Sequence, residues 1–216
     1  MCRRFGKTRG ATLLDLLQRD RRAMLTDAAI GIVATLGMRG LTHRAVDANA
    51  GMPPGTTSAY FRTRSALITG LTQRLADLDQ AELARRQLGA GGPMMGGAGA
   101  AAPTPAAIDA VADAIAALVL HLTTQARDRT LARYACLLET THRPELRELL
   151  KHGEAARAQT IELLRWAGAP NPEQRAREFV AAIDGLILDR VLDPPSSASA
   201  PKEAVRRLLH AAVALR

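Results

Sequence analysis

Residues 41–61, LTHRAVDANAGMPPGTTSAYF, decide the fold because they predict two short helices joined by a glycine turn. The Thr42 hydroxyl can accept a hydrogen bond from a first-turn amide, which predicts a helix over about 42–50. Gly51 supplies the positive φ that a sharp turn out of this helix needs. Pro54 suits the first turn of the second helix, where its missing N–H is not required.

The second helix is small, hydroxylated and free of acidic side chains that would repel phosphate. Thr57 and Phe61 lie four residues apart and share a face, which we assign to the core. The opposite face is then free to approach a DNA groove. Spacing alone also permits an ordinary corner between two helices, with Tyr60 packed inside.

Basic residues are concentrated beside this segment. Residues 1–64 contain 11 Lys and Arg against 4 Asp and Glu, whereas residues 65–216 contain 18 against 17. Nearly all of the net charge of +8 therefore lies at the N-terminal end. Binding to a phosphate backbone by counterion release requires such a basic field, so the charge favours DNA binding.

Two stretches, RRAMLTDAAIGIVATLGMRGLTHRAV from Arg21 and AGMPPGTTSAYFRTRSAL after it, resemble the tetracycline-repressor (TetR) type of bacterial transcriptional regulator. The resemblance implies an all-α fold of about nine helices, with a three-helix head that contains a helix-turn-helix and a body that binds an effector and dimerises. Pro53 stands where the family usually has a capping Ser or Thr. Thr57 replaces an apolar anchor, commonly leucine, and Ser58 replaces a tyrosine that often contacts phosphate, so a base preference does not carry over.

We expect two kinds of DNA contact. Residues at the start of the first helix and after the second would hold phosphates, as would the Tyr60 hydroxyl by resemblance. Small residues of the second helix would approach the bases. Each of these side chains is alternatively a solvent-exposed group without a DNA contact. The full set is Thr42, His43, Arg44, Pro54, Gly55, Thr56, Ser58, Ala59, Tyr60, Arg62 and Arg64.

Periodicity and composition divide the chain into an N-terminal arm over 1–18, a DNA-binding domain over 19–64 and an effector-binding and dimerisation domain over 65–216. We expect the arm to be disordered; it either adds phosphate or minor-groove contacts or is an extension without a role. A long helix over about 64–88 connects head and body. The glycine-rich stretch 89–105 predicts a flexible loop or, with less support, a substrate-entry flap.

The resemblance also implies that helices between about residues 108 and 166 enclose a small effector, whose binding moves the reading heads off the operator. Polar or aromatic residues among apolar faces are the candidate lining, with core packing or solvation as the alternative for each. These residues are His121, Tyr134, Cys136, Glu139, His142 and Trp166.

Two late segments, FVAAIDGLILDRVL (179–192) and AVRRLLHAAVAL (204–215), look like the helices with which this family forms a homodimer. A dimer would hold its two reading helices about 34–36 Å apart, or a multiple of that, to read an inverted repeat in double-stranded DNA. Packing within one chain is the alternative. The candidate interface residues are Phe179, Ile183, Leu186, Ile187, Val205, Leu208, Leu209 and Ala212.

Composition limits the other possibilities. The 216 residues are 47% hydrophobic and only 3% aromatic, which suits helices packed through aliphatic side chains. We find no signal peptide and no apolar run of about 18 residues, so we expect a cytoplasmic protein without a membrane partner. Cys2 and Cys136 are too few for a disulfide framework and belong to no metal-like cluster, so no metal or cofactor is expected.

We therefore predict a ligand-responsive repressor that dimerises on an inverted-repeat operator. The spacing of Glu139 and His142 is compatible with acid/base chemistry, but no nucleotide-binding loop, HExxH or GxSxG motif accompanies it, so we do not expect an enzyme. A helical dimer that binds a ligand or a protein without reading DNA is the remaining alternative.

Overall fold

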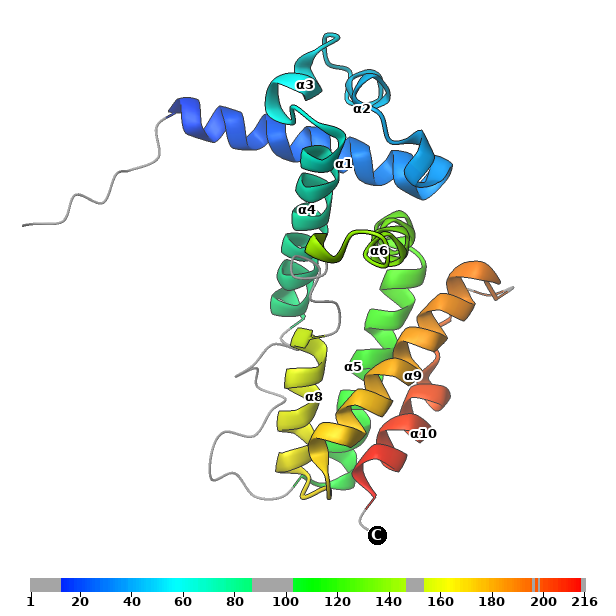
Figure 1. Cartoon of the computed structure of the whole chain (residues 1–216). Helices are drawn as coiled ribbons and strands as arrows, with labels where there is room; N and C mark the ends of the chain where they lie inside the picture. The colour runs from blue at the N-terminus through cyan, green and yellow to red at the C-terminus, as the bar shows by residue number, and fades with distance from the viewer. Residues whose placement is uncertain (1–12, 87–102, 147–153, 196, 198, 215–216) are drawn as a thin grey trace, which may run out of the picture.

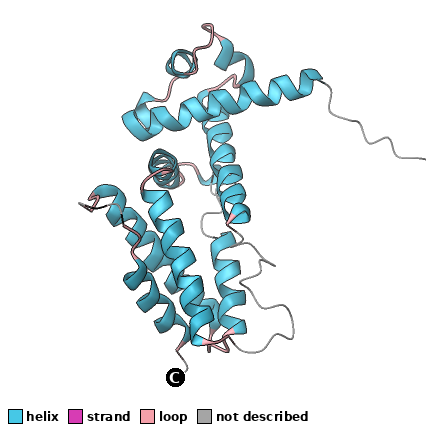
Figure 2. Cartoon of the chain, turned by 180° about the vertical axis from the view of Figure 1, so that it is seen from behind, coloured by secondary structure: helices cyan, strands magenta, loops and turns pink. Residues whose placement is uncertain are grey.

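The computed structural model describes residues 13–86, 103–146, 154–195, 197 and 199–214. Within these ranges the chain forms nine α-helices and one short 3-10 turn, with no strand, as the sequence predicts (Figures 1 and 2). The elements are α1 (Leu13–Gly40), α2 (His43–Asn49), α3 (Thr56–Tyr60), α4 (Arg64–Arg85), α5 (Pro105–Thr123), α6 (Arg127–Glu139), η1 (Pro144–Leu146), α8 (Glu154–Trp166), α9 (Pro172–Leu192) and α10 (Lys202–Val213).

The N-terminal helix starts earlier than the sequence suggested. Residues 13–18, which we assigned to a disordered arm, lie in α1, because the chain is already helical at Leu13. The rest of that arm, residues 1–12, and most of the predicted loop 89–105 lie outside the described residues. Thr104 caps α5 by accepting from the Ala107 amide at 3.2 Å, and Pro105, the last residue of the predicted loop, is the first residue of that helix.

Two hydrophobic clusters stabilise the chain. The first joins α1, α2 and α4 around Leu25, Val46, Phe61 and Leu71, and it also includes Cys136 from α6. The second lies between α5, α8, α9 and α10. Figure 1 shows α6 lying between α1 and the body, and α4 running from the head down beside it. The body is therefore in contact with the head through α6 as well as along α4.

The helix α5 is more apolar than the sequence analysis recognised. An 18-residue window within Pro105–Thr123 has a mean hydropathy of 1.7, which meets a length and composition test for a membrane span. Its residues Ile108, Ala112 and Val119 are buried in the second cluster, where α5 packs against α9 and α10. The hydropathy of α5 is thus explained by its place in the core of the body.

Candidate nucleic-acid interface

The predicted helix-turn-helix is present, and its first half matches the expectation closely. Thr42 accepts a hydrogen bond from the Ala45 amide at 3.1 Å and caps α2. Gly51 has φ 63° and lets the chain leave α2 sharply. The expected position of Pro54 is wrong: α3 begins at Thr56, and Pro54 lies in the preceding turn. The reason is Gly55, whose φ of 91° interrupts the helical backbone.

A buried carboxylate from α2 holds the start of α3. Asp47 Oδ2 accepts from the Gly55 amide at 2.8 Å, and Asp47 Oδ1 accepts from the Thr57 amide at 2.7 Å and the Thr57 hydroxyl at 2.5 Å. Asp47 is only 4% exposed and Thr57 is fully buried. Burial raises the pKa of Asp47, but the hydrogen bonds from Thr57 and Gly55 together lower it below its ordinary value.

Asp47 explains two of the three departures from the family pattern, those at Pro53 and Thr57. The cap that Pro53 cannot supply comes from the neighbouring helix, and the buried Thr57 replaces an apolar anchor because its hydroxyl donates to that same carboxylate. Sequence reasoning did not identify Asp47. The available signal was an acidic residue directly after the apolar Val46, in a helix that has no other acidic residue.

The two faces of α3 are divided as predicted. Thr57 and Phe61 are buried, whereas Gly55, Ser58 and Ala59 are exposed. Thr56 and Tyr60 are half-buried, and the Thr56 hydroxyl donates to the Pro53 carbonyl oxygen at 2.7 Å. No acidic side chain lies within α3, so its outward face presents small groups and backbone.

The Phe61 ring contacts both α1 and α4. A Cβ atom at Gly70 would lie 2.3 Å from Phe61 Cε1, so only glycine allows the ring to pack this closely on α4. The Arg22 guanidinium of α1 lies over the Phe61 ring, 4.5 Å from the ring centroid. This anchors the end of α3 between α1 and α4.

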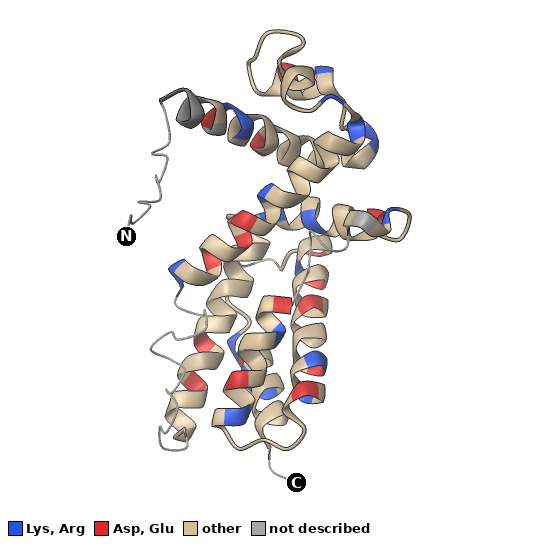
Figure 3. Cartoon of the chain, turned by 60° about the vertical axis from the view of Figure 1, so that its left-hand side comes forward, with Lys and Arg blue, Asp and Glu red and all other residues tan. Residues whose placement is uncertain are grey.

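The expected phosphate ligands fall into two groups. His43 Nε2 lies 2.6 Å from the Phe61 carbonyl oxygen, and the Arg64 guanidinium donates to the carbonyl oxygens of Leu41 and Met38. These two side chains, like the Thr42 hydroxyl, have partners inside the head and position its helices. Arg44 and Arg62 are exposed. Figure 3 shows that both signs of charge occur along the body helices.

The six candidate effector residues are not brought together. Cys136 is fully buried in the first cluster, where burial raises the pKa of its thiol to about 11. Tyr134 and Trp166 pack against the second cluster instead, and the Tyr134 hydroxyl donates to the Asp184 carbonyl oxygen at 3.2 Å. Glu139 pairs with Arg143 at 3.0 Å, and His142 is exposed after the end of α6. Residues on opposite sides of α6 face different cores, so this set does not line one site.

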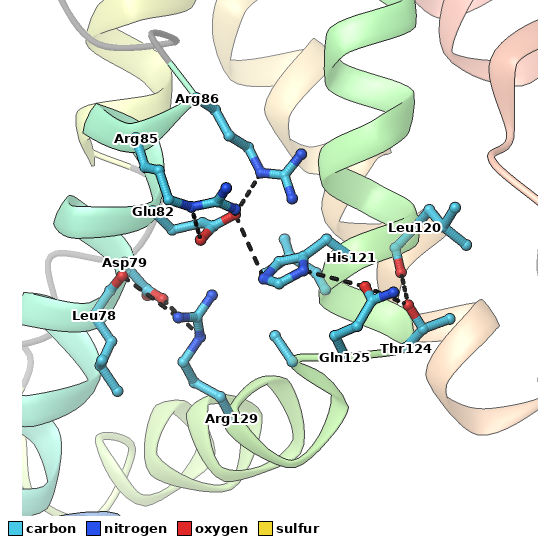
Figure 4. A network of polar contacts seen from close by, with 12 residues as sticks. Leu78, Asp79, Glu82, Arg85, Arg86, Leu120, His121, Thr124, Gln125 and Arg129 are labelled. Carbon is cyan, nitrogen blue, oxygen red and sulfur yellow. Dashed lines mark hydrogen bonds and ion pairs between the residues drawn. The ribbon is translucent and has the colours of Figure 1, made fainter.

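His121 alone among the six belongs to a polar network, which joins α4, α5 and α6 (Figure 4). Its Nε2 lies 3.4 Å from Glu82 Oε1, and its Nδ1 lies 3.2 Å from Gln125 Oε1. Burial raises the pKa of Glu82, but hydrogen bonds from Arg85 and Arg86 outweigh it and bring the value to about 2. Burial lowers the pKa of His121, which favours the neutral ring.

Sequence reasoning overlooked the rest of this network. Arg133 of α6 donates to Asp79 Oδ1 of α4, and Arg129 lies one turn earlier with its Nε 3.7 Å from the same oxygen. A recognisable signal was two arginines four apart on one helix and two carboxylates three apart on another.

Most of the predicted dimer residues lie inside the protomer. Phe179, Ile187, Val205, Leu209 and Ala212 are buried in the second cluster. The assignment of Ile187, Val205 and Leu209 to a dimer surface is wrong, whereas Phe179 and Ala212 also line a hollow between α9 and α10. Their apolar spacing serves the contact of α9 and α10 with α5 and α8. The remaining three, which are half-buried, are Ile183, Leu186 and Leu208.

Large apolar side chains are nonetheless exposed on the outer side of α9. Leu188 is 40% exposed and Leu192 is 71% exposed. Ala181 and Gly185 precede them on the same helix face and are also exposed. A hollow of about 650 Å³ lies between the N-terminal half of α9 and α10. Its lining includes the apolar residues Phe179, Ala182, Leu208 and Ala211 and the polar residues Gln174, Arg175 and Glu178.

Comparison with known proteins identifies relatives of this architecture. The profile described as the tetracyclin-repressor-like C-terminal domain matches residues 106–215. A transcriptional regulator from Rhodococcus sp. Rha1 shares 23% identity and a TM-score of 0.66, over 89% of this chain and 93% of its own. No curated protein matches the chain significantly.

Two further solved structures are similar over almost their full lengths. A TetR-family member from Streptomyces coelicolor A3 shares 25% identity, covers 91% of this chain and 99% of its own, and gives a TM-score of 0.64. The multidrug-binding protein EbrR in complex with ethidium shares 25% identity, covers 90% of this chain and 99% of its own, and gives a TM-score of 0.63.

Proposed function

The chain belongs to the tetracycline-repressor family of transcriptional regulators, and from this premise we infer that it is a dimeric repressor released from an inverted-repeat operator by a small molecule. Regulators of this family bind DNA and respond to ligands, and they are generally not enzymes. We place its action in the cytoplasm, where its DNA target lies. The observation that carries the proposal is the capped helix α3, whose outward face carries no acidic side chain.

The exposed groups of α3 contact the bases. Gly55, Ser58 and Ala59 lie on its outward face, with Thr56 and Pro54 at its start. Gly55 has no side chain, so the backbone at the start of α3 can approach a groove closely, and the hydroxyl and methyl groups of this face can contact base edges.

Exposed basic residues at either end of the helix-turn-helix of α2 and α3 bind phosphates. Arg44 and Arg62 are exposed, and Tyr60 is half-buried at the end of α3. Thr42, His43 and Arg64 contribute by fixing the helices that carry these groups. Phosphate contacts of this kind set the register on the duplex, whereas the small residues of α3 set the sequence preference.

The dimer surface is the outer side of α9 and α10. The exposed row of Ala181, Gly185, Leu188 and Leu192 gives the C-terminal half of α9 an apolar outer face. The hollow between the N-terminal half of α9 and α10, with Leu208 at its wall, offers space for side chains of a second copy. A two-fold axis through this surface would place two reading helices for successive major grooves, about 34–36 Å apart or a multiple of that.

Effector binding in the body can reach the head along two routes. The helix α4 begins in the head and extends beside the body, and α6 packs against α1. EbrR, which has a similar fold, is described as multidrug-binding and has been solved with proflavin and with ethidium, which supports an effector site in the body here. A ligand that binds more tightly when the two heads are away from the operator spacing lowers the affinity for the operator. Operator binding lowers the affinity for that ligand by the same factor.

The decisive experiment is selection of bound sequences from a random duplex pool by the full chain at near-physiological salt. Enrichment of an inverted repeat, with half-site spacing of one helical turn or a multiple, is the expected result. Retention that disappears as salt rises, without an enriched sequence, would contradict the proposal and favour a helical dimer that binds a ligand or a protein.

A further inference from the structure

Arg129, in the first turn of α6, carries a positive charge that is poorly paired among the described residues. Its side chain is 13% exposed. Its Nε and Nη2 are buried and have no hydrogen-bond partner in the part of the chain that the structure describes. The contacts that it makes are long: Nη1 lies 3.5 Å from the Leu78 carbonyl oxygen, and Nε lies 3.7 Å from Asp79 Oδ1.

Arg133, one turn later on the same helix, provides the comparison. Its side chain is 6% exposed, and its Nη2 donates to Asp79 Oδ1. Asp79 is therefore engaged by Arg133, even though the Nε of Arg133 has no partner of its own among the described residues. The two arginines share one carboxylate, and Arg129 is the more distant of the pair.

The second carboxylate of the junction, Glu82, is engaged as well. Arg85 at the end of the same helix and Arg86 directly after it donate to Glu82, and His121 approaches it from α5. Four guanidinium groups thus surround two carboxylates, which leaves a surplus of two positive charges. Burial lowers the pKa of Arg129, which means that its surroundings disfavour the charged form.

We propose that Arg129 is the anchor for an anionic group of the effector, a carboxylate or a phosphate, at the junction of α4, α5 and α6. The Nε and Nη2 atoms of a guanidinium form a planar fork that matches two oxygens of such a group. Figure 4 shows the side chains of Glu82, His121 and Arg129 pointing toward one another, so His121 is placed to contact the same ligand. The inference rests on the proposed function, because it names the chemical class of the effector.

The location gives the anion a mechanical role. Arg129 lies on α6, which packs against α1, and its nearest contacts are on α4, which begins in the head. An anion held by Arg129 competes with Asp79 and Glu82 for the same basic groups. Its binding therefore changes the contact between α4 and α6, the two helices that connect the body with the head.

The first test needs no ligand and compares Arg129→Met with Arg133→Met in the full chain by thermal unfolding. Without its anion, a buried and poorly paired cation does not stabilise the fold, so Arg129→Met should melt at the wild-type temperature or above it. Arg133→Met leaves Asp79 without its direct partner and should melt below wild type. A melting temperature of Arg129→Met below wild type would overturn the proposal, and Arg129→Gln repeats the test with a polar side chain about as long as that of methionine.

The second test adds sodium benzoate, phenyl phosphate or sodium sulfate, each against sodium chloride at matched ionic strength. At least one of the three should raise the wild-type melting temperature by about 2–4 °C, with a weaker effect or none in Arg129→Met. Benzoate alone would indicate a carboxylate ligand, and phenyl phosphate or sulfate would indicate a phosphate ligand. No rise with any probe, or an equal rise in Arg129→Met, would overturn the proposal.

The two proposals fail separately. Selection of an operator uses the wild-type protein without added anion, so its outcome does not depend on Arg129. An enriched inverted repeat together with no anion effect would leave the repressor intact and refute only the anionic effector.

Discussion

Substitution of Asp47 and Thr57, singly and together, tests how the reading helix is held. Asp47→Ala removes the carboxylate that accepts from the Gly55 amide, the Thr57 amide and the Thr57 hydroxyl. Thr57→Leu restores the apolar side chain that is usual in the family but places it against a buried carboxylate. The double variant replaces the polar pair with an apolar one.

The magnitudes follow from burial. Gly55 is exposed, so its amide can bond to water in Asp47→Ala, whereas the amide and hydroxyl of fully buried Thr57 cannot. An unsatisfied buried donor costs about 1–3 kcal/mol, so Asp47→Ala should lower the free energy of unfolding by about 2–4 kcal/mol. Thr57→Leu should cost about 2–3 kcal/mol, because it removes one hydrogen bond and crowds a buried charge.

Because the two residues form one unit, the double variant should be more stable than the sum of the single losses predicts, by about 1–3 kcal/mol. It still lacks the cap on the amides of α3, so its affinity for the selected operator should stay at least about tenfold below wild type, equivalent to about 1.4 kcal/mol. Urea unfolding measures the first quantity and fluorescence anisotropy with labelled operator measures the second.

Two results would refute this reasoning. Additive losses in the double variant, within about 0.5 kcal/mol, would show that Asp47 and Thr57 are not coupled. Full operator affinity in the double variant would show that the carboxylate stabilises the head without positioning α3.

Three further outcomes are expected. Arg62→Ala should weaken binding to all duplexes and reduce the salt dependence of DNA affinity. Ser58→Ala should weaken the binding free energy by about 1–3 kcal/mol at particular base pairs only. Competition assays with operator variants measure both effects. Changing both Leu188 and Leu192 to Glu should give a monomer in size-exclusion chromatography with light scattering, because two charges then occupy the apolar row of α9. Glu82 has its pKa lowered from 4.5 to about 2, so its contribution to stability is complete above pH 4.5 and is lost as pH falls toward 2, which acid unfolding of wild type and Glu82→Gln will compare.

The DNA-binding and dimer predictions each have a matched control. Arg165→Ala removes a charge from α8, outside the DNA-reading unit, and should leave operator binding unchanged. Leu138→Glu changes a side chain on α6 that is as exposed as Leu192, and it should leave the dimer intact. Base-specific losses in Arg62→Ala would contradict its assignment as a phosphate ligand. A dimer that survives both Leu→Glu changes would contradict the proposed dimer surface. Acid unfolding of Glu82→Gln like that of wild type would contradict the stabilising role of Glu82.

Local sequence signals predicted the head well. The Thr42 cap, the Gly51 turn and the burial of Thr57 and Phe61 depend on residues close in sequence, whose geometry is nearly fixed by the backbone. The carboxylate of Asp47 escaped prediction because its three hydrogen bonds reach eight to ten residues ahead across a turn.

The candidate sites of the body were harder to predict. Apolar periodicity identifies a buried helix face, but it does not tell whether another helix of the same chain or a second chain covers that face, so Val205 and Leu209 were assigned to the wrong contact. Similarly, Cys136 and Tyr134 are two residues apart and lie on opposite sides of α6, where they meet different cores. Their different environments arise from the packing of α6 between head and body, which local sequence patterns do not reveal.

That packing limits how members of this family can be recombined. Ala132, Cys136 and Leu146 share one hydrophobic cluster with Leu25 and Phe61 of the head. A hybrid that joins the first 64 residues of this chain to the body of a relative would cut through that cluster, and the foreign α6 would meet a surface it did not evolve to fit. Exchange of DNA specificity between relatives should therefore succeed only when α6 is transferred along with its own α1, as a matched pair.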